Sequence, residues 1–243
     1  VRLVLGPWMH FPWDRRVGAA DFGPQASGGL DALHIRWFDQ TLKGRDTGVF
    51  GEPPVQMFDT GAKQWRGFAH WPSGPVSMAL SGDGRASIDA TAGALRWPHE
   101  AADAALEHIV HDPWRPSPSV GGAFGAPTGP VDRASVDARG DVLTFTSAPV
   151  TAPLTLAGDV MLDVEATSDA ASFDLSCVLS RVTVAGQVIP CAEGYAVVAQ
   201  DIAHIPMRAC CVTLHPGEAL RLSLAGAFYP AFAIDRKSTR LNS

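Results

Sequence analysis

The 243-residue sequence has no surplus of basic residues and no long apolar run. Its 19 Lys and Arg residues are outnumbered by 25 Asp and Glu residues, which gives a formal net charge of −6 at pH 7. A phosphate backbone would repel such a chain, so we expect no nucleic-acid partner. No apolar run approaches the roughly 18–20 residues that a membrane-spanning helix needs, so we expect no membrane partner. A hydrophobic fraction of 46% is typical of a globular protein.

The spacing that marks a zinc site is also missing. The four cysteines, which show neither C-x-x-C spacing nor flanking ligands, are Cys177, Cys191, Cys210 and Cys211. Neighbouring residues of a strand point to opposite faces, so at most one of Cys210 and Cys211 can face the core. By the same rule His108 and His111 leave opposite faces of an expected strand. We interpret the cysteines as buried free thiols and predict no metal and no cofactor.

A third absence concerns the catalytic nucleophile. The sequence contains no G-x-S-x-G, the turn that presents the serine of an α/β-hydrolase. In that fold the order along the chain is serine, acid, histidine, and the histidine lies in a loop after a strand. Such a histidine stands at the start of this sequence, where apolar residues 2–5 break at Gly6-Pro7 and lead to Trp8 and His10. We therefore predict that His10 is the general base of a serine hydrolase whose other catalytic residues precede residue 1.

The residues around His10 are open to two interpretations. Trp8 and Phe11 flank the histidine and could line an acyl pocket, although packing explains them equally well. The nearby acidic residues, which all follow the histidine, are Asp14, Asp21, Asp31 and Asp39. Chain order assigns none of them to the catalytic triad. Without a serine to activate, we expect this polypeptide alone to have no triad-dependent esterase activity.

The spacing of apolar residues changes once along the chain. Between residues 30 and 44 apolar side chains recur at helical intervals, with Lys43 in the last turn and Gly44 as the C-cap. One strand and one amphipathic helix cannot bury a core, so residues 1–52 are predicted to be the C-terminal remnant of an α/β-hydrolase catalytic domain.

From residue 53 onward short alternating runs replace the helical spacing, for example at 160–167, 175–179 and 220–224. They predict a mainly β fold, a jelly-roll β-sandwich over residues 53–234. Irregular stretches at 81–104 and 112–141 are expected to wrap this sandwich.

The last nine residues, 235–243, differ from the rest. They are polar and carry two net positive charges in an otherwise acidic chain. A codon string that resembles a common sequencing-library adapter encodes them residue for residue. We interpret them as a translated, non-native tail and expect them to pack poorly.

Several segments together resemble the CocE/NonD hydrolases, the group that includes cocaine esterase, α-amino-acid ester hydrolases and X-Pro dipeptidyl-peptidases. Residues 6–10 match the histidine motif of this family, and residues 37–44 match its terminal catalytic-domain helix. Residues 112–122, 141–147 and 168–174 resemble three signatures of its sandwich domain. Two positions depart from the pattern: Glu218 stands where the family usually has a histidine, and Phe173 where a smaller polar residue is common.

The resemblance implies a serine hydrolase that cleaves an ester or amide bond through an acyl-enzyme. Its partners would be a small-molecule ester or peptide substrate and the N-terminal catalytic portion of the same protein. The Gly121-Gly122-Ala123-Phe124 loop could offer Phe124 to the mouth of the active site across the domain interface, or it could be a surface turn.

A second hypothesis is a carbohydrate- or polymer-binding β-sandwich without catalysis. The tryptophans that could stack on a sugar are Trp65, Trp71, Trp97 and Trp114, although such residues lie more often in the core. A sandwich that leans over His10 would favour the enzyme, and an aromatic platform far from His10 would favour binding. The sequence assigns no cellular compartment.

Overall fold

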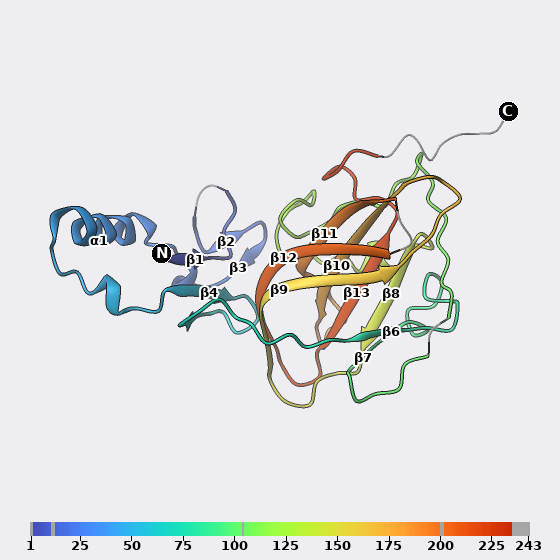
Figure 1. Cartoon of the computed structure of the whole chain (residues 1–243), viewed down its shortest axis with the longest axis horizontal. Coiled ribbons are helices and arrows are strands. Elements are labelled where there is room, and N and C mark those ends of the chain that lie inside the picture. The colour runs from blue at the N-terminus through green and yellow to red at the C-terminus, as the bar shows by residue number, and fades with distance from the viewer. Residues whose placement is uncertain (1, 11–12, 104, 200–201, 235–243) are drawn as a thin grey trace.

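A computed structural model describes residues 2–10, 13–103, 105–199 and 202–234. Phe11, predicted to line an acyl pocket, lies outside these residues, and so does the predicted non-native tail at 235–243. Figure 1 shows an elongated molecule in which a small α/β part at the N-terminal end lies beside a larger β-sandwich.

The N-terminal part contains a three-stranded sheet, a two-stranded ribbon and one long helix. Its elements are β1 (Leu3–Leu5), β2 (Arg16–Val17), β3 (Ala20–Asp21), η1 (Pro24–Ala26), α1 (Leu30–Lys43), η2 (Val49–Gly51), β4 (Val55–Asp59) and β5 (Gln64–Phe68). In the sheet β1 is parallel to β4, and β4 is antiparallel to β5. The apolar run at residues 2–5 thus contains a strand that pairs in parallel, as such a run predicts, but the expected burial is wrong, because no residue of β1 is buried and Leu3 is 39% exposed.

Helix α1 confirms the predicted helix and its end. It stops at Lys43, and Gly44 follows in the left-handed conformation with φ 65°, which glycine adopts without steric cost. None of its residues is buried. Ile35, Phe38 and Leu42 are 63%, 52% and 76% exposed, so they face solvent at the end of the molecule farthest from the sandwich.

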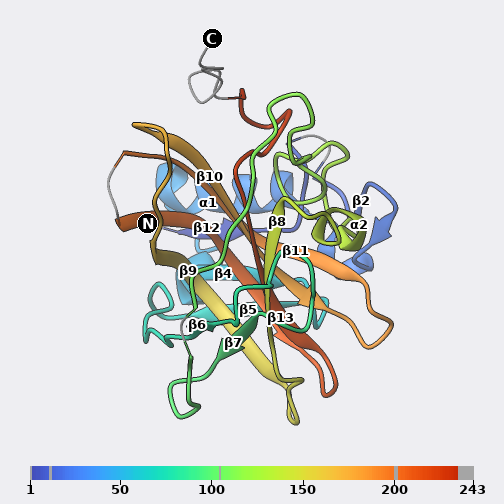
Figure 2. The same cartoon turned by 90° about the vertical axis from the view of Figure 1, so that its right-hand side faces the viewer.

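The sandwich consists of a six-stranded sheet and a two-stranded sheet, which confirms the mainly β fold. Its elements are β6 (Ala79–Ser81), β7 (Ala94–Arg96), α2 (Ala134–Asp137), β8 (Val142–Ser147), β9 (Leu154–Glu165), β10 (Phe173–Val182), β11 (Val188–Val198), β12 (Ile202–Leu214) and β13 (Ala219–Ala225). The larger sheet has the order β11-β10-β13-β8-β7-β6, and β12 pairs with β9 in front of it (Figures 1 and 2).

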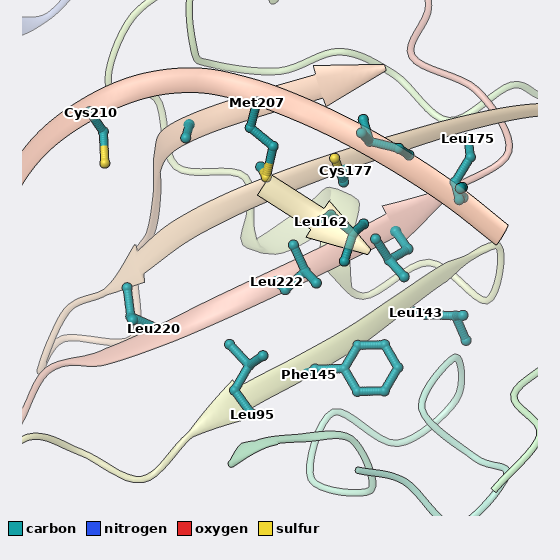
Figure 3. Packing of buried hydrophobic residues seen from close by; sticks show 14 of the residues in the cluster. Leu95, Leu143, Phe145, Leu162, Leu175, Cys177, Met207, Cys210, Leu220 and Leu222 are labelled. Atoms are coloured by element: carbon teal, nitrogen blue, oxygen red, sulfur yellow. The ribbon is translucent and has the colours of Figure 1, made fainter. Parts of the chain in front are cut away.

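The main hydrophobic core lies between these two sheets. Figure 3 shows Leu162 of β9 and Met207 of β12 pointing toward Leu222 of β13 and Phe145 of β8. The alternation at residues 220–224 therefore marks a strand with one face in the core, as predicted. Its leucines enter this core, and the side chain of Arg221 donates a hydrogen bond to Thr146 on the other face.

The outer face of the six-stranded sheet is covered by the segment 112–141, as expected. Arg133 and Asp137 form a buried ion pair there with an N–O distance of 3.0 Å. The hydroxyl of Ser223 donates to Asp137 over 2.9 Å. The ion pair and the Ser223 hydrogen bond offset part of the cost of burying these charged groups.

Two sequence-based expectations about the irregular segments were wrong. The stretch 81–104 does not only wrap the sandwich, because its residues 94–96 form β7 in the sheet. The segment around His108 and His111 is not a strand. Instead the carboxylate of the neighbouring Glu107 accepts hydrogen bonds from the amides of Gly84 and Ala86 over 2.8 Å each.

Strands β4 and β5 lie after residue 52, yet β4 pairs with β1 and β5, and neither is a strand of the sandwich sheets. The short runs after residue 53 predicted strands, but such a pattern does not specify the partner of a strand. The predicted division between residues 52 and 53 remains a prediction.

Candidate functional site

The loop that carries His10 is shaped by a close contact between Gly6 and Trp8. A Cβ on Gly6 would lie 2.3 Å from the indole of Trp8, so only glycine allows this ring to fold back. The indole N–H donates to the carbonyl of Ala26 over 2.5 Å, and the ring packs against Trp65 with centroids 5.6 Å apart. Trp8 is therefore held in place, and His10 follows it at an exposed position.

A cleft of about 940 Å³ lies between this loop and the sandwich. One wall is formed by the end of β1 and by Trp8 and His10, and the other by the loop around Phe124 and by parts of β11 and β12. The structure thus brings together three of the four predicted site residues, His10, Trp8 and Phe124. Phe11, the fourth, lies outside the described residues.

A buried glutamate that sequence analysis did not single out positions the Phe124 loop. The side chain of Glu193 on β11 accepts the backbone amides of Ala123 and Phe124 over 2.8 and 3.2 Å. A Cβ on Gly122, whose φ is +70°, would lie 1.7 Å from this carboxylate, so the glycine is required there. The feature of the sequence that could have indicated this interaction is the single acidic residue in the otherwise apolar run of β11. The loop is thus anchored to the sheet through two of its backbone amides.

Burial raises the pKa of Glu193, and the hydrogen bond from Ala123 and the positive charge of Arg208 offset this effect in part. Arg208 on β12 also lines the cleft, with its guanidinium carbon 5.0 Å from the ring centroid of Phe124. A carboxylate, a guanidinium and an aromatic ring thus lie together opposite His10.

The two parts of the molecule are joined by the fully buried side chain of Asp59 at the end of β4. Its carboxylate accepts the amide of Ala62 over 2.9 Å, Nε of Arg66 over 2.7 Å, and both the amide and the hydroxyl of Thr213 on β12. The amide of Thr60 adds a bond to the carbonyl of Cys211 over 3.0 Å. Because β1 pairs with β4, this joint determines where the His10 loop lies relative to the sandwich.

Three cysteines line the cleft, Cys191, Cys210 and Cys211. All are free thiols, as predicted, and burial raises the pKa of Cys191 and of Cys211 to about 11. They are therefore protonated at neutral pH and unsuited as nucleophiles. Cys210 is part of the main core, in agreement with the expectation that at most one of Cys210 and Cys211 faces it. Cys211 points to the other face of β12 and is buried there by the turn after β4.

The tryptophans occupy different environments. Trp65 packs against Phe58 in the N-terminal part, Trp97 packs against the main core, and the indole of Trp71 donates to Asp159. Trp114 is 87% exposed on a loop. Within the described ranges, no three His, Cys, Asp or Glu side chains are placed to hold a metal ion together. Nor does any helix in the described part of the chain have the length and apolar character needed to cross a bilayer.

Residues 47–243 match the family described as the X-Pro dipeptidyl-peptidase C-terminal non-catalytic domain. His10 lies before this region. The chain is 29% identical over 202 residues to cocaine esterase of Rhodococcus sp. (strain MB1 Bresler), a match that covers 79% of this chain and 35% of that protein. The chain therefore spans about a third of the length of this curated relative.

Solved structures show the same fold. An aminopeptidase from a marine sediment Thaumarchaeota archaeon superposes with a TM-score of 0.79 at 20% identity, over 98% of this chain and 43% of that one. An α-amino acid ester hydrolase superposes with a TM-score of 0.76 at 23% identity, over 97% of this chain and 44% of that one.

Proposed function

Since the chain belongs to the family of X-Pro dipeptidyl-peptidase C-terminal domains, and its resemblance to the CocE/NonD hydrolases is confirmed, we propose that it is the histidine-bearing and substrate-shaping part of a serine hydrolase. The reaction is cleavage of an ester or amide bond through an acyl-enzyme. The observation that carries the proposal is the single cleft lined by His10 on one side and by the sandwich on the other.

In this mechanism His10 takes the proton of a serine hydroxyl as the serine attacks the substrate carbonyl. It then gives that proton to the leaving group, and repeats both steps with water to release the acid. The serine, the orienting aspartate and the oxyanion hole would come from a catalytic portion outside the printed sequence. The exposed position of His10 at the cleft supports this role, because the ring is accessible to such partners.

We propose that Trp8 and Phe124 form opposite walls of the substrate site. Trp8 is held by Ala26 and Trp65, and Phe124 is held through the amides that Glu193 accepts, so both rings are pre-organised. A small ester or a short peptide fits a cleft of about 940 Å³. The names of the relatives, an esterase and an ester hydrolase among them, support the same substrate class.

The domain organisation belongs to the same proposal. We assign residues 1–52 to the end of an α/β-hydrolase domain and residues 53–234 to a sandwich of jelly-roll type, with the strand pair β4–β5 as the connection. The binding-module hypothesis gains no support, because the sandwich faces His10 and the tryptophans are dispersed.

The proposal is tested by His10→Ala in the full-length protein that carries this chain, assayed with 4-nitrophenyl acetate. We expect kcat/KM to fall at least about 10³-fold, because removal of a triad histidine leaves only binding and oxyanion stabilisation. His70→Ala, which changes an exposed histidine outside the cleft, is the matched control and should retain activity. An active His10→Ala protein would refute the assignment.

A further inference from the structure

A second, smaller cavity lies on the sandwich side of Phe124. Its volume is about 260 Å³, and it is open to solvent and lined by residues of β11, of β12 and of the segment that follows β13, together with Phe124. Phe124, Glu193 and Arg208 line both this cavity and the His10 cleft. A group bound in the smaller cavity would therefore be adjacent to whatever occupies the cleft.

Four of the nine residues that line this cavity are aromatic. Tyr195 and Phe232 stack with centroids 4.0 Å apart and planes 2° from parallel. The rings of Phe124 and Phe232 pack edge to face with their centroids 6.1 Å apart. Phe228, which is buried, lies next to Phe232 with a centroid distance of 6.3 Å. A cavity of about 150 Å³ holds benzene. The cavity thus has room for one ring with a small polar group, and its aromatic lining suits an aromatic ligand.

The charge at the entrance favours an anion. In the part of the chain that the structure describes, no carboxylate lies within ion-pair distance of Arg208, whose guanidinium rests on the ring of Phe124. The neighbouring carboxylate of Glu193 already accepts two backbone amides and is 6% exposed. A cationic ligand would meet Arg208 first, whereas a carboxylate could accept two parallel hydrogen bonds from it.

We propose that Arg208 and the aromatic cavity form a subsite for an aryl carboxylate, with Arg208 holding the carboxylate and the rings of Phe124, Tyr195 and Phe232 holding the aryl group. The inference deepens the proposed function, on which it rests for its biological meaning. According to this inference, the substrate is an ester or amide that carries an aryl carboxylate group in addition to the bond that is cleaved. Binding at the subsite itself needs no catalysis, so it can be measured on this chain.

The test is calorimetric titration of the whole chain with phenylacetate, compared with phenylacetamide and acetate. We expect phenylacetate to bind in the millimolar range and the two analogues, which lack the charge or the ring, to bind about 10-fold more weakly or not at all. Arg208→Gln should weaken phenylacetate binding about 10-fold, and Arg208→Lys, which keeps the charge without the planar fork, should weaken it less.

Arg115→Gln is the matched control, because Arg115 is an exposed arginine of the sandwich region that lines neither cavity. His10→Ala should leave phenylacetate binding unchanged, so a failed subsite and a failed catalytic proposal give different results. Equal affinity for the acid and the amide, or no effect of Arg208→Gln in a variant with unchanged Tm, would overturn the inference. Absence of phenylacetate binding at millimolar concentration would overturn it as well.

Discussion

At the scale of single residues, the geometry of the cleft depends on one buried carboxylate. Burial alone would raise the pKa of Asp59, but the hydrogen bonds from Ala62, Thr213 and Arg66 together lower it below its ordinary value of 3.8. A lowered pKa in the folded state means that the ionised carboxylate stabilises the fold. This contribution is complete above the pKa of the unfolded chain and is lost as the pH falls through the lower pKa of the folded protein.

We therefore expect Asp59→Asn to lower the free energy of unfolding by about 3 kcal/mol at pH 7, because it leaves the Arg66 guanidinium and several buried donors without their acceptor. The difference from the native chain should narrow as the pH falls below about 4. Urea denaturation at pH 7 and at pH 3 measures both effects. Asp163→Asn, which changes an exposed partner of His204, is the control and should have a far smaller effect. A difference that stays constant across this pH range would contradict the argument.

At the scale of elements, α1 is a helix that packs Trp37 against Phe50 but leaves other apolar side chains exposed in the described part of the chain. Ile35, Phe38 and Leu42 project into solvent, while ion pairs such as Lys43–Asp39 and hydrogen bonds to residue 47 hold the helix and its following turn in place. Apolar helical spacing usually indicates a buried face, because burial of that face stabilises most protein helices. We therefore expect the proposed catalytic portion to pack against these exposed side chains of α1.

We expect Leu42→Ala to change the free energy of unfolding of this chain by less than about 0.5 kcal/mol, since Leu42 is 76% exposed and alanine favours helices. Leu222→Ala in the main core is the matched comparison and should cost about 2–5 kcal/mol. In the full-length protein the Leu42 substitution should become costly. Equal costs for the two substitutions in the isolated chain would show that the helix face is already packed.

At the scale of the whole molecule, two parts face each other across one cleft. The N-terminal part contributes a histidine, and the sandwich contributes aromatic and charged side chains. The sequence holds no nucleophile elbow, and the cysteines of the cleft are protonated. Activity should therefore appear only when a serine from a catalytic portion is added.

We expect a fluorophosphonate probe to leave the isolated chain unlabelled and to label the full-length protein at a serine before His10. Gel fluorescence and peptide mapping measure the labelling, and cocaine esterase serves as the positive control. Labelling of the isolated chain at a serine, lost in the His10→Ala variant, would mean that the chain contains its own nucleophile.

Much of the fold could be predicted from periodicity. The helix over residues 30–43 and the strands around 160, 176 and 222 follow from spacing, since each side-chain period matches one backbone geometry. Pairing could not be predicted: the short runs after residue 53 indicate strands, but only the folded chain shows that the strand at 55–59 joins β1. The segment around His108 was misjudged for the same reason, because the carboxylate of Glu107 bonds to the amides of Gly84 and Ala86, which lie 23 and 21 positions away in the chain.

The sequence by itself determined the mainly β class, the family resemblance and the candidate histidine, because these depend on local spacing and on motifs that are contiguous along the chain. Only the tertiary structure decided that Glu193 anchors the Phe124 loop, that Asp59 joins the two parts and that Arg208 lies over the ring of Phe124 at an aromatic cavity. Each of those contacts links residues about 70 to 154 positions apart. Proximity at such separations is produced by packing and is not encoded in any local pattern.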